Sequence, residues 1–156
     1  MATALPVDAA PHERELVLTR FFDAPRALVF AAWTDADRLN QWWGPRGFAV
    51  LRCHADVRIG GIWRVESRAP EGGAHICGGV YRDVAPPERL VFTMAWEGVE
   101  DGEPGRETVV SIDFAEDGAG TRLTFRQATF SSREARDAHD EGWSSSFELL
   151  EEYLAR

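Results

Sequence analysis

Hydrophobic and polar residues alternate along most of the chain from about residue 47 to residue 130. A period of two is typical of strands that bury one face. About six strand-like stretches follow one another, at 47–61, 62–68, 75–84, 89–96, 108–114 and 121–130. Most are joined by short breaks, and a parallel crossover needs a dozen or more residues, so we expect antiparallel neighbours.

The pattern before this region predicts a strand followed by a helix. Residues 14–22 are rich in β-branched and apolar side chains, as strands are. Pro25 suits a first helical turn, where its missing N–H would have no partner in any case. Val29, Phe30 and Trp33 then recur three and four residues apart, which places them on one helical face.

A second, short helix is expected over residues 35–43. Thr34 is a suitable N-cap, and Gly44 with Pro45 should end the helix. Trp42 and Trp43 can both face the sheet, so packing is the expected role of the pair. One of them could also line the mouth of an interior pocket.

The last segment, 131–156, predicts one long amphipathic helix of about 24 residues. Ser131 and Glu134 match a capping box, and Phe130 is placed as a possible hydrophobic staple. Bulky and small residues mix on the face that should turn inward: His139, Gly142, Trp143, Ser146, Phe147, Leu150 and Leu154. Small residues beside large ones leave volume unfilled unless the sheet supplies it.

The element order is therefore β-α-α-β6-α, an α+β fold. We expect a curved antiparallel sheet of about seven strands wrapped around the C-terminal helix, an arrangement that leaves room for a cavity. Residues 13–156 should form a single domain, preceded by a short disordered leader, 1–12. No stretch has the roughly 20 apolar residues of a bilayer span, and no signal peptide is evident, so a cytoplasmic protein is expected.

Charge and composition narrow the chemistry. The formal net charge is −9, which disfavours nucleic acids and anionic membranes. The basic residues are all arginines, so a Schiff-base lysine and a P-loop lysine are both excluded. The cysteines, Cys53 and Cys77, should lie two strands apart, roughly 9–10 Å, which is too far for a disulfide.

The sequence offers no motif for a metal, a nucleotide or a hydrolytic triad. His75 with Cys77, and Cys53 with its neighbour His54, do not follow metal-ligand spacing. His139 and Ser146 lie about 10 Å apart along a helix, beyond the reach of a base and its nucleophile. The acidic loop 97–107 lacks the spacing of a calcium loop. We therefore assign no catalytic residue, no metal ligand and no cofactor.

Several stretches, in order, resemble the START-like (SRPBCC) superfamily, and within it the branch named after the C-terminal domain of the activator of the heat-shock chaperone ATPase. They are "RFFDAPRALVFAAWTDADRLNQWWGP", "DVRIGGIWR", "GGVYRDVAPPERLVFT", "GTRLTF" and a late "GW". The resemblance covers about residues 14–155. It implies a helix-grip fold, in which the sheet grips the long helix around an apolar pocket.

The leading hypothesis is a protein that binds a hydrophobic or amphipathic small molecule in such a pocket. Candidate lining residues are Trp33, Trp42, Trp43, Trp63, His75, Tyr81, Phe92, Met94, Trp96, Ile112, Phe125, Gln127, His139, Trp143 and Phe147. One alternative is a cyclase- or isomerase-like enzyme acting on an aromatic or polyketide substrate through His75, Tyr81, Gln127 or His139. Another alternative, implied by the resemblance, is a chaperone-interaction module. The chaperone activators carry an additional N-terminal domain, for which the segment before residue 14 is too short, so a chaperone partner is less expected.

Overall fold

The computed structural model describes residues 11–100, 103–104 and 106–156. In chain order the elements are η1 (Pro11–Arg14), β1 (Leu16–Phe22), α1 (Arg26–Thr34), α2 (Ala36–Trp42), β2 (Ala49–Ala55), β3 (Ile62–Arg68), β4 (Ala74–Ala85), β5 (Arg89–Trp96), β6 (Val99–Glu100), β7 (Glu103–Pro104), β8 (Thr108–Asp117), β9 (Gly120–Ala128) and α3 (Arg133–Leu154). Most of the expected leader, residues 1–10, lies outside the described residues, and its last part belongs to η1.

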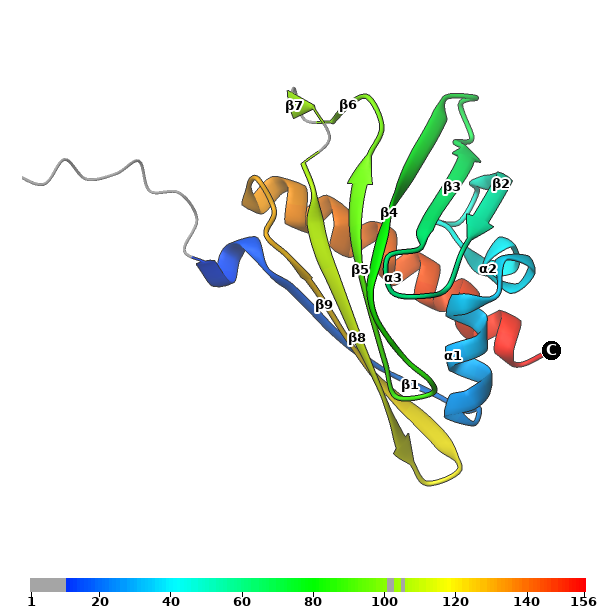
Figure 1. Cartoon of the computed structure of the whole chain (residues 1–156). Helices are drawn as coiled ribbons and strands as arrows, with labels where there is room; N and C mark the ends of the chain where they lie inside the picture. Colours follow the sequence, from blue (N-terminus) through cyan, green and yellow to red (C-terminus); the bar gives the residue numbers. More distant parts are fainter. Residues whose placement is uncertain (1–10, 101–102, 105) are drawn as a thin grey trace, which may run out of the picture.

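The main sheet has seven antiparallel strands in the order β1-β9-β8-β5-β4-β3-β2. Helix α3 runs across one face of the curved sheet, and α1 and α2 lie near its C-terminal half (Figure 1). The α1–α2 segment connects the two edge strands, β1 and β2, which are far apart in the sheet. The predicted α+β helix-grip fold is confirmed.

The consecutive strands β2, β3 and β4 pair antiparallel, as the short connections between them predict. Cys53 on β2 pairs with Val65 on β3, and Val65 pairs with Cys77 on β4. The two cysteines are therefore two strands apart, as expected, and both are free thiols. The acidic loop forms a separate two-stranded ribbon, β6 with β7, outside the main sheet.

The core lies between the sheet and α3 and is unusually aromatic. Trp33 of α1 is 2% exposed and lies near its centre. Its ring centroid is 4.7 Å from that of Trp42, 5.8 Å from that of Trp143 and 6.1 Å from that of Phe147. Aromatic pairs at such distances add to the free energy of burying their surface. This end of the core is therefore filled by rings.

Two helix caps differ from the sequence expectation by one residue. Asp35, rather than Thr34, caps α2 by accepting a hydrogen bond from the backbone N–H of Asp37, whereas the Thr34 hydroxyl donates to the Phe30 carbonyl inside α1. Ser132, rather than Ser131, caps α3 by accepting from the backbone N–H of Ala135 at 3.0 Å. The expected capping box is therefore wrong, although both helices begin within a residue of the predicted place.

Candidate functional site

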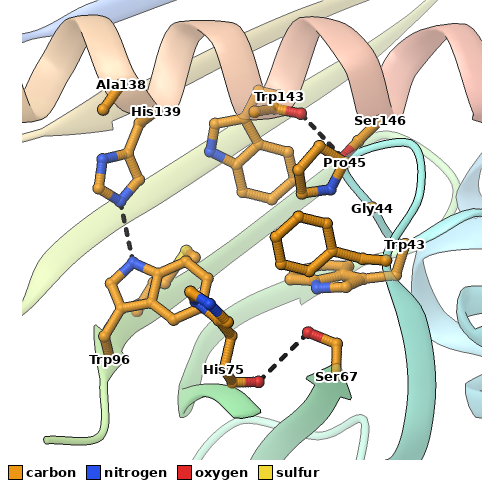
Figure 2. A pocket seen from close by; sticks show the side chains of 13 residues that line it. Trp43, Gly44, Pro45, Ser67, His75, Trp96, Ala138, His139, Trp143 and Ser146 are labelled. Atoms are coloured by element: carbon orange, nitrogen blue, oxygen red, sulfur yellow. Dashed lines mark hydrogen bonds between the residues drawn. The ribbon is translucent and has the colours of Figure 1, made fainter. Parts of the chain in front are cut away.

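A pocket of about 180 Å³ opens between α3, the sheet and the loop that follows α2 (Figure 2). The described residues that line it are mostly aromatic or small: Trp43, Gly44, Pro45, Phe48, Ser67, His75, Met94, Trp96, Ala138, His139, Gly142, Trp143 and Ser146. Apolar walls with a few polar groups are typical of small-molecule sites.

Helix α3 supplies one wall through residues three and four apart, which share a helical face. Trp143 is bulky, whereas Ala138, Gly142 and Ser146 are small. The Ser146 hydroxyl donates to the carbonyl of Gly142, so it turns back on its own helix. This face therefore combines one large aromatic surface with open volume.

Gly142 is not required by packing within the protein. A Cβ atom built on Gly142 would meet no protein atom within 4 Å. Gly79 on β4 is different, because a Cβ there would lie 1.9 Å from the carbonyl oxygen of Thr93. A glycine inside a helix destabilises it by roughly 0.5–1 kcal/mol relative to alanine. The missing side chain of Gly142 therefore leaves space in the pocket at a cost in stability.

One rim of the pocket is the loop from Gly44 to Phe48, which is hydrogen-bonded to α3. The backbone N–H of Arg46 donates to the Ser145 hydroxyl at 2.9 Å. The Arg46 guanidinium also pairs with the Glu152 carboxylate and lowers the pKa of that carboxyl. Both interactions are exposed to solvent, so we assign them a positioning role rather than a large share of the stability.

His139 and Trp96 bridge the helix to the end of β5 across the pocket (Figure 2). The indole Nε1–H of Trp96 donates to His139 Nε2 at 3.0 Å. Because an indole is a donor only, Nε2 carries no proton in this contact. His139 Nδ1 lies 2.7 Å from the carbonyl oxygen of Ala135 and takes the donor role. The geometry thus selects the neutral Nδ1–H tautomer.

The sheet side carries a second polar group and a rim of rings. The Ser67 hydroxyl donates to the backbone carbonyl of His75 at 3.2 Å. The His75 ring contacts Phe48, at 5.3 Å between centroids, and Trp96, at 6.2 Å. It lies 3.9 Å from the carboxylate of Glu71, at the exposed edge. His75 therefore belongs to the mouth of the pocket rather than to its interior.

Gln127 lies under the pocket and orients its wall. Its Oε1 accepts the indole N–H of Trp143 at 2.8 Å, and its Nε2 donates to the Thr108 hydroxyl at 2.9 Å. Nε2 also lies 3.5 Å from the sulfur of Met94. With its side chain completely buried, the amide ties β9 to α3 and has its hydrogen-bonding capacity used within the protein.

The structure brings together six of the candidates inferred from sequence around this pocket: Trp43, His75, Met94, Trp96, His139 and Trp143. It places the other nine in the surrounding core, outside the lining: Trp33, Trp42, Trp63, Tyr81, Phe92, Ile112, Phe125, Gln127 and Phe147. Several of these, including Tyr81, enclose a much smaller space of about 10 Å³ that Trp43 also borders. Burial raises the pKa of the Tyr81 phenol, and Cys53 and Asp56 add to the shift.

Five lining residues were not anticipated from the sequence: Gly44, Pro45, Phe48, Ser67 and Ala138. Gly142 and Ser146 were recognised only as small residues on the inner helix face. The signal that could have drawn attention to the loop residues is the Gly-Pro pair directly after Trp43, which predicts a turn at the end of α2.

Other kinds of site find no support in the part of the chain that the structure describes. Within it, no three or more His, Cys, Asp or Glu side chains gather so that they could hold a metal ion. Among the described helices, none is both long enough and apolar enough to cross a membrane. The thiol of Cys53 has its pKa raised to about 11, mainly by burial and also by Asp37, so it is a poor nucleophile.

A family model and several solved structures match this chain over most of its length. The family model described as "Activator of Hsp90 ATPase homolog 1-like protein" matches residues 23–155. A protein from Chromobacterium violaceum is 27% identical and superposes with a TM-score of 0.83 over 92% of this chain and 98% of that one. The AHSA1 protein of Silicibacter pomeroyi is 31% identical, with a TM-score of 0.80 over 90% and 97% of the two chains.

The search of curated proteins returned no match. A further solved structure, from Nitrosomonas europaea, is 27% identical, with a TM-score of 0.75 over 97% of this chain and 98% of that one. The matched region includes every strand of the main sheet except β1, together with the pocket-lining part of α3. The chain belongs to the Activator of Hsp90 ATPase homolog 1-like family.

Proposed function

We propose that this domain binds a small hydrophobic or amphipathic molecule in the pocket between α3 and the Gly44–Phe48 loop. The observation that carries the proposal is Gly142, a glycine in the middle of the longest helix that no neighbouring protein atom requires. Alanine would stabilise a helix at such a position. A ligand that occupies this space gives the missing side chain a physical reason.

The pocket is small, which favours a compact ligand. An engineered apolar cavity of roughly 150 Å³ binds benzene, and the volume here is about 180 Å³. Pockets that hold drug-sized ligands have volumes of roughly 300–1,000 Å³. A molecule with one or two rings therefore fits better than an extended lipid or a polyketide chain.

The positions of the candidate catalytic side chains argue against the cyclase or isomerase alternative. Of the four side chains considered for such chemistry, Tyr81 and Gln127 do not line the pocket, and Gln127 is engaged by Thr108 and Trp143. His139 is held as a neutral ring by Trp96 and the Ala135 carbonyl. Binding without chemistry needs none of these groups to exchange a proton.

The family description supports a second candidate, an interaction with a chaperone ATPase. On the sheet, Ile62 of β3 pairs with Val80 of β4, and Ile59 lies in the loop just before β3; all three side chains are exposed. Exposed apolar residues that cluster mark interaction surfaces. The test is the ATPase rate of an Hsp90-type chaperone with the wild-type domain and with Ile62→Arg. A rate that neither protein changes would remove this candidate.

Binding in the pocket is tested by filling it. We expect indole, a two-ring probe, to shift the NMR signals of Trp43, Trp96 and Trp143 in the wild-type protein. Gly142→Leu should weaken this binding about tenfold or more, because leucine takes the space of the ligand. Glu141→Leu is the matched control, since it adds the same side chain at an exposed neighbouring position.

Thermal denaturation of both variants separates pocket filling from loss of structure. Both should stay folded, and Gly142→Ala should raise the free energy of unfolding by roughly 0.5–1 kcal/mol. Equal binding by wild-type and Gly142→Leu proteins of equal stability would rule out this pocket as the site.

A further inference from the structure

The hydrogen-bond donors of the tryptophans point to the class of ligand. The chain has six tryptophans, and four of their indole N–H groups donate to acceptors in the protein: Trp42 to the Ala32 carbonyl, Trp63 to the Thr93 carbonyl, Trp96 to His139 and Trp143 to Gln127. The other two are Trp33 and Trp43. They differ in what surrounds them.

Trp33 Nε1 is fully buried and is the one buried side-chain nitrogen or oxygen of the described residues that lacks a partner. Trp43 Nε1 also has no hydrogen-bond acceptor among the described residues, yet it is not one of the fully buried atoms, so it keeps some accessible surface. Trp43 lines the pocket, and Figure 2 shows it with Ser67 on one side, opposite Trp96 and His139. An indole donor without an acceptor in a largely apolar wall costs free energy.

Apart from the His75 ring at the exposed mouth, the other polar side chains of the pocket are already engaged as donors. The Ser67 hydroxyl donates to the His75 carbonyl and the Ser146 hydroxyl to the Gly142 carbonyl. The Trp96 indole donates to His139. Inside the mouth, the Trp43 N–H is thus the side-chain donor of the described lining that is left for a ligand.

Behind His75, which lies at the exposed mouth, the described lining contains no arginine, aspartate or glutamate, and His139 is held in its neutral tautomer. A charged ligand would lose its hydration there without meeting an opposite charge. The walls are ring faces and edges, with Trp43 and Trp143 at 5.3 Å between centroids. Flat aromatic molecules pack well against such surfaces.

We propose that the ligand is a neutral aromatic compound of one or two rings carrying a hydrogen-bond acceptor, such as a carbonyl oxygen, that receives the Trp43 indole N–H. This inference rests on the proposed function, since it names the kind of molecule the pocket takes. The Ser67 hydroxyl oxygen is available to accept a hydrogen bond from a donor group on the ligand. The acceptor fixes the direction in which the ring enters.

The test uses acetophenone and cumene, which have nearly the same size and shape but differ in the carbonyl group. Binding is followed by NMR in the wild-type protein and in Trp43→Phe, which keeps an aromatic ring but removes the donor. Loss of ring size affects both probes, so the ratio of their affinities isolates the hydrogen bond. We expect Trp43→Phe to lower the acetophenone preference about three- to tenfold.

In the wild-type protein, the Trp43 indole N–H signal should move downfield with acetophenone and not with cumene. This comparison needs no variant and stands even if Trp43→Phe folds poorly. If both probes bind in the pocket with an unchanged ratio and the same indole shift, this inference is overturned and the proposed function stands. If neither probe binds, both are overturned.

Discussion

Gln127→Met should destabilise the fold by about 2 kcal/mol. Methionine keeps the length of the side chain, but its sulfur is only a weak acceptor for the indole N–H of Trp143, which is 5% exposed. A buried donor left without an acceptor costs about 1–3 kcal/mol. The Thr108 hydroxyl still donates to the Met94 carbonyl in the variant, so losing the Gln127 amide there adds little to the destabilisation. The gain from burying methionine instead of an amide offsets part of the loss.

Urea denaturation followed by circular dichroism measures this change. The midpoint should fall with an unchanged slope, because the surface exposed on unfolding stays the same. In a thermal scan, 2 kcal/mol corresponds to a decrease in Tm of about 4–8 °C for a chain of this length. An unchanged midpoint would mean that the Trp143–Gln127 hydrogen bond contributes nothing net.

A double-mutant cycle with Trp143→Phe checks the assigned cause. Phenylalanine has no indole donor, so Gln127→Met should destabilise a Trp143→Phe protein about 1–2 kcal/mol less than it destabilises the wild type. Independent, additive effects of the two substitutions would refute the hydrogen bond as the source. Gln127→Met should also weaken ligand binding, because Trp143 is then free to change its position in the pocket wall.

Other predictions concern the helix cap and the thiols. Ser132→Ala should lower the free energy of unfolding by about 1 kcal/mol, because the Ser132 hydroxyl accepts the backbone N–H of Ala135. Ser131→Ala should change the denaturation midpoint far less. Equal effects of the two substitutions would contradict the assigned cap. Burial holds the Cys53 thiol protonated and raises its pKa from 9.0 to about 11. Its thiolate fraction at pH 8 is therefore about a hundredfold below that of an ordinary cysteine. Cys53 should react slowly with a thiol reagent until the pH approaches 11 or the protein unfolds. Fast labelling of Cys77→Ser, which leaves Cys53 alone, would contradict this reasoning.

The sequence could predict the fold because both periodicities are strong. Consecutive strand-like stretches placed Cys53 and Cys77 two strands apart, and the structure confirms this, with Val65 between them. The caps were less predictable, since Ser131 and Ser132 are neighbours with the same side chain. The sequence pattern does not say which of them takes the extended backbone of an N-cap.

The site could be predicted only in part. The sequence shows which residues lie on the same face of a helix or strand, but not which part of the space between the sheet and α3 is filled by side chains. Phe125 and Phe147 lie on the predicted inner faces, yet rings from α1 and α2 close that end of the fold. The pocket remains where Gly142 and Ser146 face the Gly44–Phe48 loop. That loop is about a hundred residues away in sequence, and no local pattern indicates its contact with α3.

The most direct test of pocket binding is a crystal structure of the wild-type protein grown with saturating acetophenone. We predict electron density for the ring between Trp96 and Trp143, with the carbonyl oxygen within about 3 Å of Trp43 Nε1. An empty pocket under these conditions, or a molecule bound only outside the residues that line it, would contradict the account.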